Sequence, residues 1–165
     1  MLWTWLHHSL WEPTPAPLRA REVLARPEVR IYAEDWGRPG DVGVVAEVDN
    51  RDVGGCWMRR FSAGVGHGYV DDETPQLAIA LLPEFRRQGH GQTLLMTALH
   101  MAREAGYRRV SLCVHPENPA VTLYERGGFH ACGERNGYLL MLTELAPLGE
   151  KVAQPGNQPP DVVRH

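Results

Sequence analysis

Two glycines, Gly89 and Gly91, are separated by one residue, and they follow a pair of arginines at the start of an apolar-periodic segment. Glycine permits backbone conformations and close approaches that side chains forbid. The unpaired amides and the positive dipole end of a helix N-terminus favour a bound phosphate. The stretch from Leu82 to Leu95 therefore predicts a pyrophosphate seat where a helix begins.

Other interpretations of this stretch fit less well, although a lone Gly-x-Gly run is more often a simple turn. Gly91-Gln92-Thr93 lacks the lysine of the G-K-S/T P-loop, and its glycine run is too short. Nucleic-acid binding through Arg86 and Arg87 would need a wider basic stripe, whereas the formal net charge is −3.

The flanking segments predict a strand and a helix around this seat. Residues 76–82 form an apolar strand-like run that ends just before it. After Gly91 the apolar residues follow the 3.6-residue helical period until Gly106, where a left-handed cap is favoured. The apolar face of this helix must cover a sheet, and its residues are Leu94, Leu95, Ala98, Leu99 and Ala102.

The remaining elements are predicted from periodicity and from turn residues. Residues 42–48 and 53–61 predict a hairpin around the polar turn 49–52. Pro13, Pro15 and Pro17 predict a stiff connector. Helical segments are expected at 2–11, 18–25, 28–35 and 120–126, and further strands at 110–114 and 138–142.

Two motifs together resemble the GCN5-related N-acetyltransferase (GNAT) family. Arg86, Gly89 and Gly91 match its R/Q-x-x-G-x-G/A motif after a strand. Residues 118–129 look like its N-x-A-x-x-L-Y-E-x-x-G-F signature. The resemblance covers roughly residues 36–143.

The resemblance implies an α/β fold with a mixed, mostly antiparallel twisted sheet and helices on both faces. It also implies that two parallel strands beside the glycine motif splay apart. We expect one domain over residues 1–146 and a disordered tail over 147–165, which is rich in proline, glycine and glutamine. The usual first strand is either upstream or absent, and its absence would leave a sheet edge that a second protomer could cover as a homodimer.

The resemblance further implies that acetyl-CoA is the cosubstrate. The amides of residues 88–92 would hold its pyrophosphate, with charge from the arginines, while backbone groups of the preceding strand would meet the pantetheine arm. Asn118 would either bond that arm or cap the short helix that follows it. The predicted cofactor contacts are Leu81, Leu82, Arg86, Arg87, Gln88, Gly89, His90, Gly91, Gln92, Thr93 and Asn118.

Tyr124 matches the tyrosine that protonates the leaving thiolate in many relatives, although an aromatic residue there could simply pack behind Leu123 and Phe129. Many relatives place a glutamate base on the strand before the glycine motif, where this chain has Gln76. Glutamine cannot accept the proton. Glu73 or His115 could act instead through a water chain, and each could equally be an ordinary loop residue.

Composition narrows the remaining possibilities. The 165 residues are 43% hydrophobic and 22% charged, which is ordinary for one globular domain. Three cysteines without a C-x-x-C pair and the lack of a signal peptide predict a reduced, cytoplasmic protein. Eight histidines lack paired-ligand spacing, so no metal is expected, and neither a nucleic-acid partner nor a membrane is predicted.

These observations predict an N-acetyltransferase that moves the acetyl group of acetyl-CoA to a primary amine by direct attack. The amine could belong to a small molecule or to a peptide. Aromatic residues near the N-terminus could line an acceptor pocket or fill the core: Trp3, Trp5, Trp11, Tyr32 and Trp36. The alternative is an acyl-CoA-binding module of the same fold without turnover.

Overall fold

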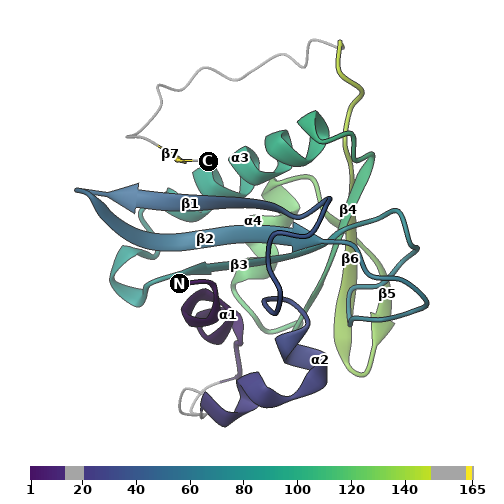
Figure 1. Ribbon diagram of the computed structural model, residues 1–165, viewed down its shortest axis with the longest axis horizontal. Helices are drawn as coiled ribbons and strands as arrows, with labels where there is room; N and C mark the ends of the chain where they lie inside the picture. Colours follow the sequence, from purple (N-terminus) through teal and green to yellow (C-terminus); the bar gives the residue numbers. More distant parts are fainter. Residues whose placement is uncertain (14–20, 150–162, 165) are drawn as a thin grey trace.

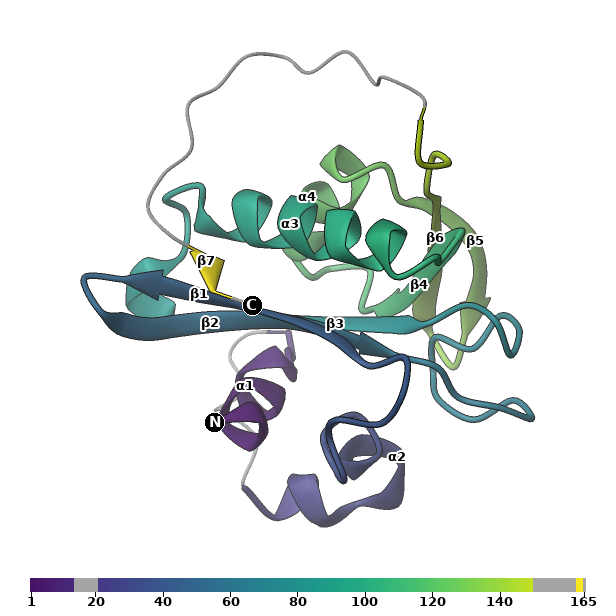
Figure 2. The ribbon, with the colours of Figure 1, turned by 45° about the horizontal axis from the view of Figure 1, so that its top comes forward.

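The chain forms one sheet with helices on both faces (Figures 1 and 2). The computed structural model describes residues 1–13, 21–149 and 163–164. The strand order is β5-β6-β4-β3-β2-β1-β7, and every neighbouring pair is antiparallel except β3 and β4. This confirms the predicted α/β architecture. The elements are α1 (Leu2–Ser9), η1 (Arg21–Ala25), α2 (Pro27–Arg30), β1 (Val42–Val48), β2 (Arg51–Arg59), β3 (Gln76–Leu81), η2 (Pro83–Phe85), α3 (His90–Glu104), β4 (Arg109–Val114), α4 (Ala120–Arg126), β5 (His130–Arg135), β6 (Tyr138–Glu144) and β7 (Val163–Arg164), where η marks a 3₁₀ helix.

The hairpin of β1 and β2 reverses at the predicted polar turn. Asp49 and Asn50 have φ values of 50° and 60°. Two successive positive φ angles are what a tight hairpin turn requires, and asparagine and aspartate tolerate them better than other non-glycine residues. Val48 and Arg51 are consequently paired directly across the turn.

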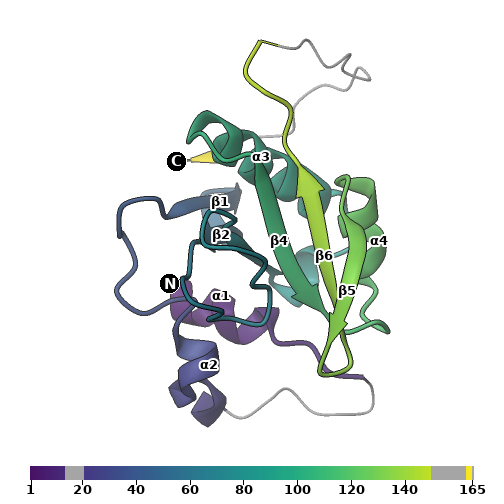
Figure 3. The same ribbon diagram turned by 90° about the vertical axis from the view of Figure 1, so that its right-hand side faces the viewer.

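The strands β3 and β4 diverge as soon as they have met. They are parallel and share a single pair, Gln76 with Ser111. Each is firmly held on its other side, β3 by β2 and β4 by β6. Figure 3 shows β4, β6 and β5 as one half of the sheet, running in a different direction from β1 and β2. The predicted splay beside the glycine motif is therefore present.

Helices α3 and α4 cover one face of the sheet (Figure 2). The predicted apolar face of α3 is buried completely, with Leu95 and Ala98 at 0% exposure. These side chains pack against inward-facing residues from several strands, such as Met58, Leu112 and Met141. This layer fixes where α3 begins, and hence where its N-terminal amides lie.

Helices α1 and α2 cover the opposite face (Figure 2). Trp5 and Leu6 of α1 are buried against Trp57 and Ala80 of the sheet. Gly55 leaves room for the indole, since a Cβ there would lie 3.1 Å from Cδ1 of Trp5. The N-terminal helix is thus seated across β2 and β3, beside the point where β3 leaves β4.

A buried arginine secures the segment that follows α2. The Arg59 guanidinium donates to the carbonyl oxygens of Ile31 and Glu34 at 2.8 and 2.7 Å, and it pairs with the Asp41 carboxylate at 2.6 Å. Both charged side chains are almost inaccessible, at 1% and 6% exposure. The indole of Trp57 adds a bond of 2.9 Å to the Tyr32 carbonyl. Residues 31–35 are therefore held firmly against β2.

Two strands of the structure were not predicted from the sequence. Strand β5 is a polar edge strand, His-Ala-Cys-Gly-Glu-Arg, and its exposed side chains give no apolar alternation. Strand β7 has two residues, which pair with Val45 and Ala46 on the free edge of β1. Thus no strand precedes α1 in the described residues, and the edge that the missing strand would cover receives β7. The homodimer and the disordered tail remain predictions.

The predicted segment 18–25 is described only in part, because residues 14–20 lie outside the described residues. Its end is the 3₁₀ helix η1. The connector predicted from Pro13, Pro15 and Pro17 falls largely in the same undescribed range.

We predict that Asp41→Asn lowers the free energy of unfolding by about 3–5 kcal/mol, because it leaves the buried Arg59 charge uncompensated. Chemical denaturation at neutral pH measures this. Glu73→Gln is the control: its pair with Arg60, at 3.4 Å, joins side chains with 42% and 85% exposure. Exposed pairs contribute at most about 1 kcal/mol. Equal losses in the two variants would contradict the assignment.

The same pair predicts a pH dependence of stability. Burial raises the pKa of Asp41, but hydrogen bonds from Arg59 and the Gly37 amide outweigh it, so the pKa lies below its ordinary value. A depressed folded-state pKa contributes stability above the unfolded-state pKa, and this stability is lost as the pH falls through the folded value. The difference between the parent and Asp41→Asn should therefore shrink below about pH 4.

Candidate active site

The start of α3 has the features of a phosphate seat. Gly89 is its N-cap, with a left-handed φ of 86°, and no side chain caps the helix. A Cβ at Gly89 would meet nothing within 4 Å, so the space beside this N-cap residue is open. Arg87 also has a positive φ, 59°, which turns the chain tightly into the helix. The amides of His90, Gly91 and Gln92 lie in this first turn, where an anion is favoured.

The second glycine, Gly91, lies inside the first turn of α3. Gly91 has no positive φ, and a Cβ on it would lie 3.5 Å from Leu123 and from Leu81, in ordinary contact. A methyl group would therefore fit at this position, and the local packing does not itself require glycine. Thr93 closes the first turn by donating its amide to the Gly89 carbonyl at 3.2 Å.

Side chains near the seat are partly engaged by the loop itself. Arg86 donates Nε to the Leu81 carbonyl at 3.0 Å, and Gln88 donates Nε2 to the Glu84 carbonyl at 2.8 Å. Leu82 donates its amide to Val53 at 2.8 Å and accepts from the Phe85 amide at 2.9 Å. Both main-chain groups of Leu82 are thus used within the protein, which makes it the weakest of the predicted cofactor contacts.

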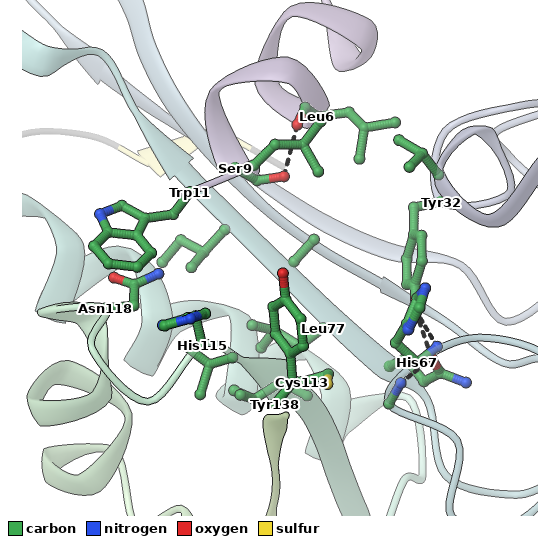
Figure 4. Close-up of a pocket in the computed structure, with 18 of the residues that line it drawn as sticks. Leu6, Ser9, Trp11, Tyr32, His67, Leu77, Cys113, His115, Asn118 and Tyr138 are labelled. Carbon is green, nitrogen blue, oxygen red and sulfur yellow. Dashed lines mark hydrogen bonds between the residues drawn. The ribbon is translucent and has the colours of Figure 1, made fainter. Parts of the chain in front are cut away.

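A cavity of about 360 Å³ lies over the divergence of β3 and β4 (Figure 4). Trp11 and Asn118 form one side, Tyr32 and His67 the other, and the Tyr138 hydroxyl points into the space between them. Its lining comes from α1, α2, β3, β4, α4 and the start of β6, which no single sequence motif brings together. Further lining residues are Leu6, Ser9, Glu28, Gln76, Leu77, Cys113, His115 and Tyr124.

Tyr124 lies where both predicted roles are possible. Its side chain is 8% exposed and its ring meets Phe129 edge-on, with centroids 5.9 Å apart. It also lines the cavity. Burial, with a smaller contribution from Cys56, raises the pKa of Tyr124. The hydroxyl therefore keeps its proton near neutral pH.

Asn118 directly precedes Pro119, the N-cap of α4, and it also lines the cavity. Its Oδ1 accepts from the Ala120 amide at 2.9 Å, which leaves the amide nitrogen for the cavity. Both tasks suggested by the sequence are thus open to the one side chain. The neighbouring His115 ring lies between Trp11 and Tyr138, with centroids 5.3 and 5.5 Å away.

The two candidate bases are placed very differently. His115 lines the cavity, but its Nδ1 accepts from the Glu117 amide at 3.1 Å. That bond puts the proton of the neutral ring on Nε2, where it can donate but cannot accept. Glu73 does not reach the cavity: it is 85% exposed and pairs with Arg60 on another part of the surface. Neither residue is therefore a well-placed direct base.

The sequence profile of the Acetyltransferase (GNAT) family matches residues 3–129. The chain belongs to the GNAT acetyltransferase family. It is thus an acyltransferase of the GNAT fold, as the two motifs predicted. The matched range includes α1 and α2 as well as the glycine motif, and it extends to the end of the second motif at Phe129.

The chain also resembles individual GNAT proteins. It is 34% identical over 109 residues to a Bacillus subtilis (strain 168) protein provisionally named ribosomal protein bS18-alanine N-acetyltransferase, and the match spans 66% of each chain. Ribosomal-protein-alanine N-acetyltransferase from Brucella melitensis has a similar structure, with a TM-score of 0.63, 22% identity and coverage of 87% of this chain and 92% of that one. Salmonella typhimurium yncA, solved with acetyl-CoA, gives a TM-score of 0.57 and 17% identity over 84% and 81%.

The aromatic residues suggested for an acceptor pocket divide into three groups. Trp11 and Tyr32 line the cavity, whereas Trp5 is core. Trp3 and Trp36 are 40% and 38% exposed. Tyr138 and Cys113 were not predicted as site residues. The alternation of β4 could have placed Cys113 on the other face of the sheet from the buried Leu112. No sequence pattern, however, indicates that Tyr138 at the start of β6 lies at the cavity.

In residues 1–13, 21–149 and 163–164, no three histidine, cysteine or acidic side chains gather as a metal site would require. No helix within the same ranges combines the length and the hydropathy of a membrane span.

We predict that Gly89→Val weakens acetyl-CoA binding at least about tenfold, because the branched side chain strains the left-handed N-cap and fills the open seat. Isothermal titration calorimetry measures this affinity. Gly106→Val is the matched control. It has a φ of 91° with open space around it, at the other end of the same helix. Similar losses of affinity in both variants would mean that strain in α3, and not the seat, is responsible.

Proposed function

We propose that the protein transfers the acetyl group of acetyl-CoA to a primary amine by direct attack of the amine on the thioester. The observation that carries this proposal is the divergence of β3 and β4 beyond their single pair, with the cavity lying over it and the α3 seat following β3 in the chain. Acetyl-CoA supplies an activated acyl thioester when bound. The residues that fit it are the α3 first turn, Gly89 and Asn118.

Three parts of the chain would bind the cosubstrate, align it and protonate the leaving group. The N-terminal amides of α3 and the nearby Arg87 hold the anionic end of the cosubstrate. The free backbone of β3, beyond its single pair with β4, aligns the arm of the cosubstrate between the diverging strands. Tyr124 holds a proton beside the cavity and donates it to the departing thiolate.

Direct attack is favoured over an acyl-enzyme by the state of the cavity thiol. Cys113 is the cysteine among the described lining residues, and burial raises its pKa to about 11. A thiolate, and not a thiol, is the effective nucleophile. Cys113 is therefore protonated near neutral pH and is a poor acyl carrier, whereas an amine that enters the cavity can reach the thioester itself.

The amine must lose a proton before it attacks. Its ordinary pKa is near 10.4 for an alkyl ammonium group. Glu28 is the one carboxylate among the described lining residues, and it is exposed. We infer that water in the open cavity removes the proton and that the rate rises with pH. A peptide N-terminus, with a pKa near 7.7–8.0, needs less of this help.

The acceptor class is tested first with a peptide that begins with alanine, because the Bacillus subtilis relative is named for that activity. Lysine side chains, polyamines and amino sugars complete the panel, and released thiol is recorded against acetyl-CoA. Acetylated product with at least one amine supports the transferase. Tight acetyl-CoA binding without turnover on any of these amines would favour the acyl-CoA-binding module.

We predict that Tyr124→Phe lowers turnover by about 10²- to 10⁴-fold, the usual contribution of general-acid assistance. The ring and its contact with Phe129 remain, so acetyl-CoA affinity and the melting temperature should change little. Steady-state kinetics with the best amine measure the effect. Tyr138→Phe is the control, since it removes a different tyrosine hydroxyl, one that points into the cavity (Figure 4). Parental turnover in Tyr124→Phe would return Tyr124 to a packing role.

A further inference from the structure

Gln76 has an unusual position for a polar residue, because its side chain is buried where β3 and β4 meet. It is 1% exposed. Its Oε1 accepts from the Tyr32 hydroxyl at 2.8 Å and from the Gly68 amide at 3.0 Å, while its Nε2 donates to the Val65 carbonyl at 2.9 Å. One amide thus joins β3, the turn after α2 and the loop before β3.

The loop is shaped to wrap around this amide. Gly66 has a φ of 90°, and a Cβ there would lie 2.3 Å from Oε1 of Gln76. A Cβ at Gly68 would lie 3.2 Å from the same oxygen. The Gly68 carbonyl also accepts from the Ser111 hydroxyl at 2.6 Å. Gln76 and Ser111, which pair across β3 and β4, therefore both hydrogen-bond to Gly68.

Tyr32 completes the arrangement. Its hydroxyl donates to Gln76 and accepts from the His67 amide at 3.2 Å. Burial raises the pKa of Tyr32 to about 12, so the hydroxyl remains a donor. Tyr32, His67, Gly68 and Gln76 all line the cavity. Figure 4 shows Tyr32 and His67 on the side opposite Trp11 and Asn118.

We propose that Gln76 is a positioning residue for the acceptor: its amide fixes Tyr32 and residues 65–68 as one wall of the cavity. We call this arrangement the Gln76 clamp. Its effect on the acceptor amine rests on the proposed function, whereas the clamp itself does not. The clamp needs a group that donates and accepts at once, which the amide does at every pH and a carboxylate does not.

This requirement gives Gln76→Glu an informative pH dependence. A protonated carboxyl group can replace the amide, since its O–H can donate to the Val65 carbonyl. The ionised carboxylate would face that carbonyl without a proton between them and would release the loop. Burial raises the pKa of a carboxyl group, so the change should fall between about pH 6 and pH 9.

Other titratable groups near the clamp are shared by the parent and the variant. They are Tyr32 after α2, His67 in the loop, Cys113 on β4, and Arg135 on β5, which donates to the His67 carbonyl at 3.0 Å. Comparing the variant with the parent at each pH therefore assigns the difference to residue 76.

The first readout does not need turnover. Hydrogen-exchange protection factors of the His67 and Gly68 amides should match the parent at low pH in Gln76→Glu and fall at least about tenfold as the pH rises. Tyr32→Phe keeps the ring and should lower His67 protection at every pH. Val65→Ala is the control, because it keeps the main-chain carbonyl and its side chain is already 45% exposed. Unchanged protection in both clamp variants would overturn the clamp.

The second readout is kinetic. With the amine found for the parent, KM for the amine should rise about tenfold in Gln76→Glu at high pH and about fivefold in Tyr32→Phe, while KM for acetyl-CoA stays within about twofold. A glutamate acting as general base would do the opposite, with turnover above the parent and rising with pH. That result, or a parental amine KM in both variants, would overturn the positioning role.

The two readouts separate the possible failures. A parent without turnover on any amine refutes the proposed function, and the exchange data still decide the clamp. A parent with turnover and a released loop that leaves the amine KM unchanged refutes the positioning role alone.

Discussion

The single backbone pair between Gln76 and Ser111 is the constraint on which the rest of the structure depends. Each strand is held by an antiparallel neighbour along its length, so neither needs the other beyond that pair. Sheet twist then carries the two halves apart. The two strands thus form a wedge. At its closed end the side chains of Gln76 and Ser111 both hydrogen-bond to the backbone of Gly68, and at its open end α3 begins.

The helical layers on the two faces of the sheet are held in place beside this wedge by different interactions. On one face α3 is fixed by a fully buried apolar stripe, so the position of its first turn follows from packing. On the other face the cavity wall after α2 is fixed mostly by polar groups: Arg59 with Asp41, the Trp57 indole and the Gln76 amide. Buried polar networks are costly unless every member is satisfied, and satisfied ones specify one arrangement. These hydrogen bonds therefore hold the cavity wall after α2 in one arrangement.

The sequence predicted the parts that local patterns encode. The period of α3, the polar turn at Asp49 and Asn50 and the alternation of β4 each specify an element, and the two motifs indicated the family. The polar edge strand β5 was missed because no buried face marks it. The cavity wall could not be predicted, since the partners of Gln76 lie 8, 11 and 44 residues away and are brought together only by the completed sheet. The sequence showed only that Gln76 stands where many relatives have a glutamate base.

With glutamine at position 76, the protonation states of the other cavity residues limit the chemistry of the site. Tyr32 and Tyr124 are held protonated by burial, Cys113 is held as a thiol, and the His115 ring offers a donor. The described lining is thus rich in proton donors and poor in acceptors. Such a cavity offers few groups that could take the proton that an entering ammonium group must lose. Amines that are already partly neutral near pH 7 would therefore be favoured, and the neutral clamp at Gln76 keeps their binding surface the same shape across that range.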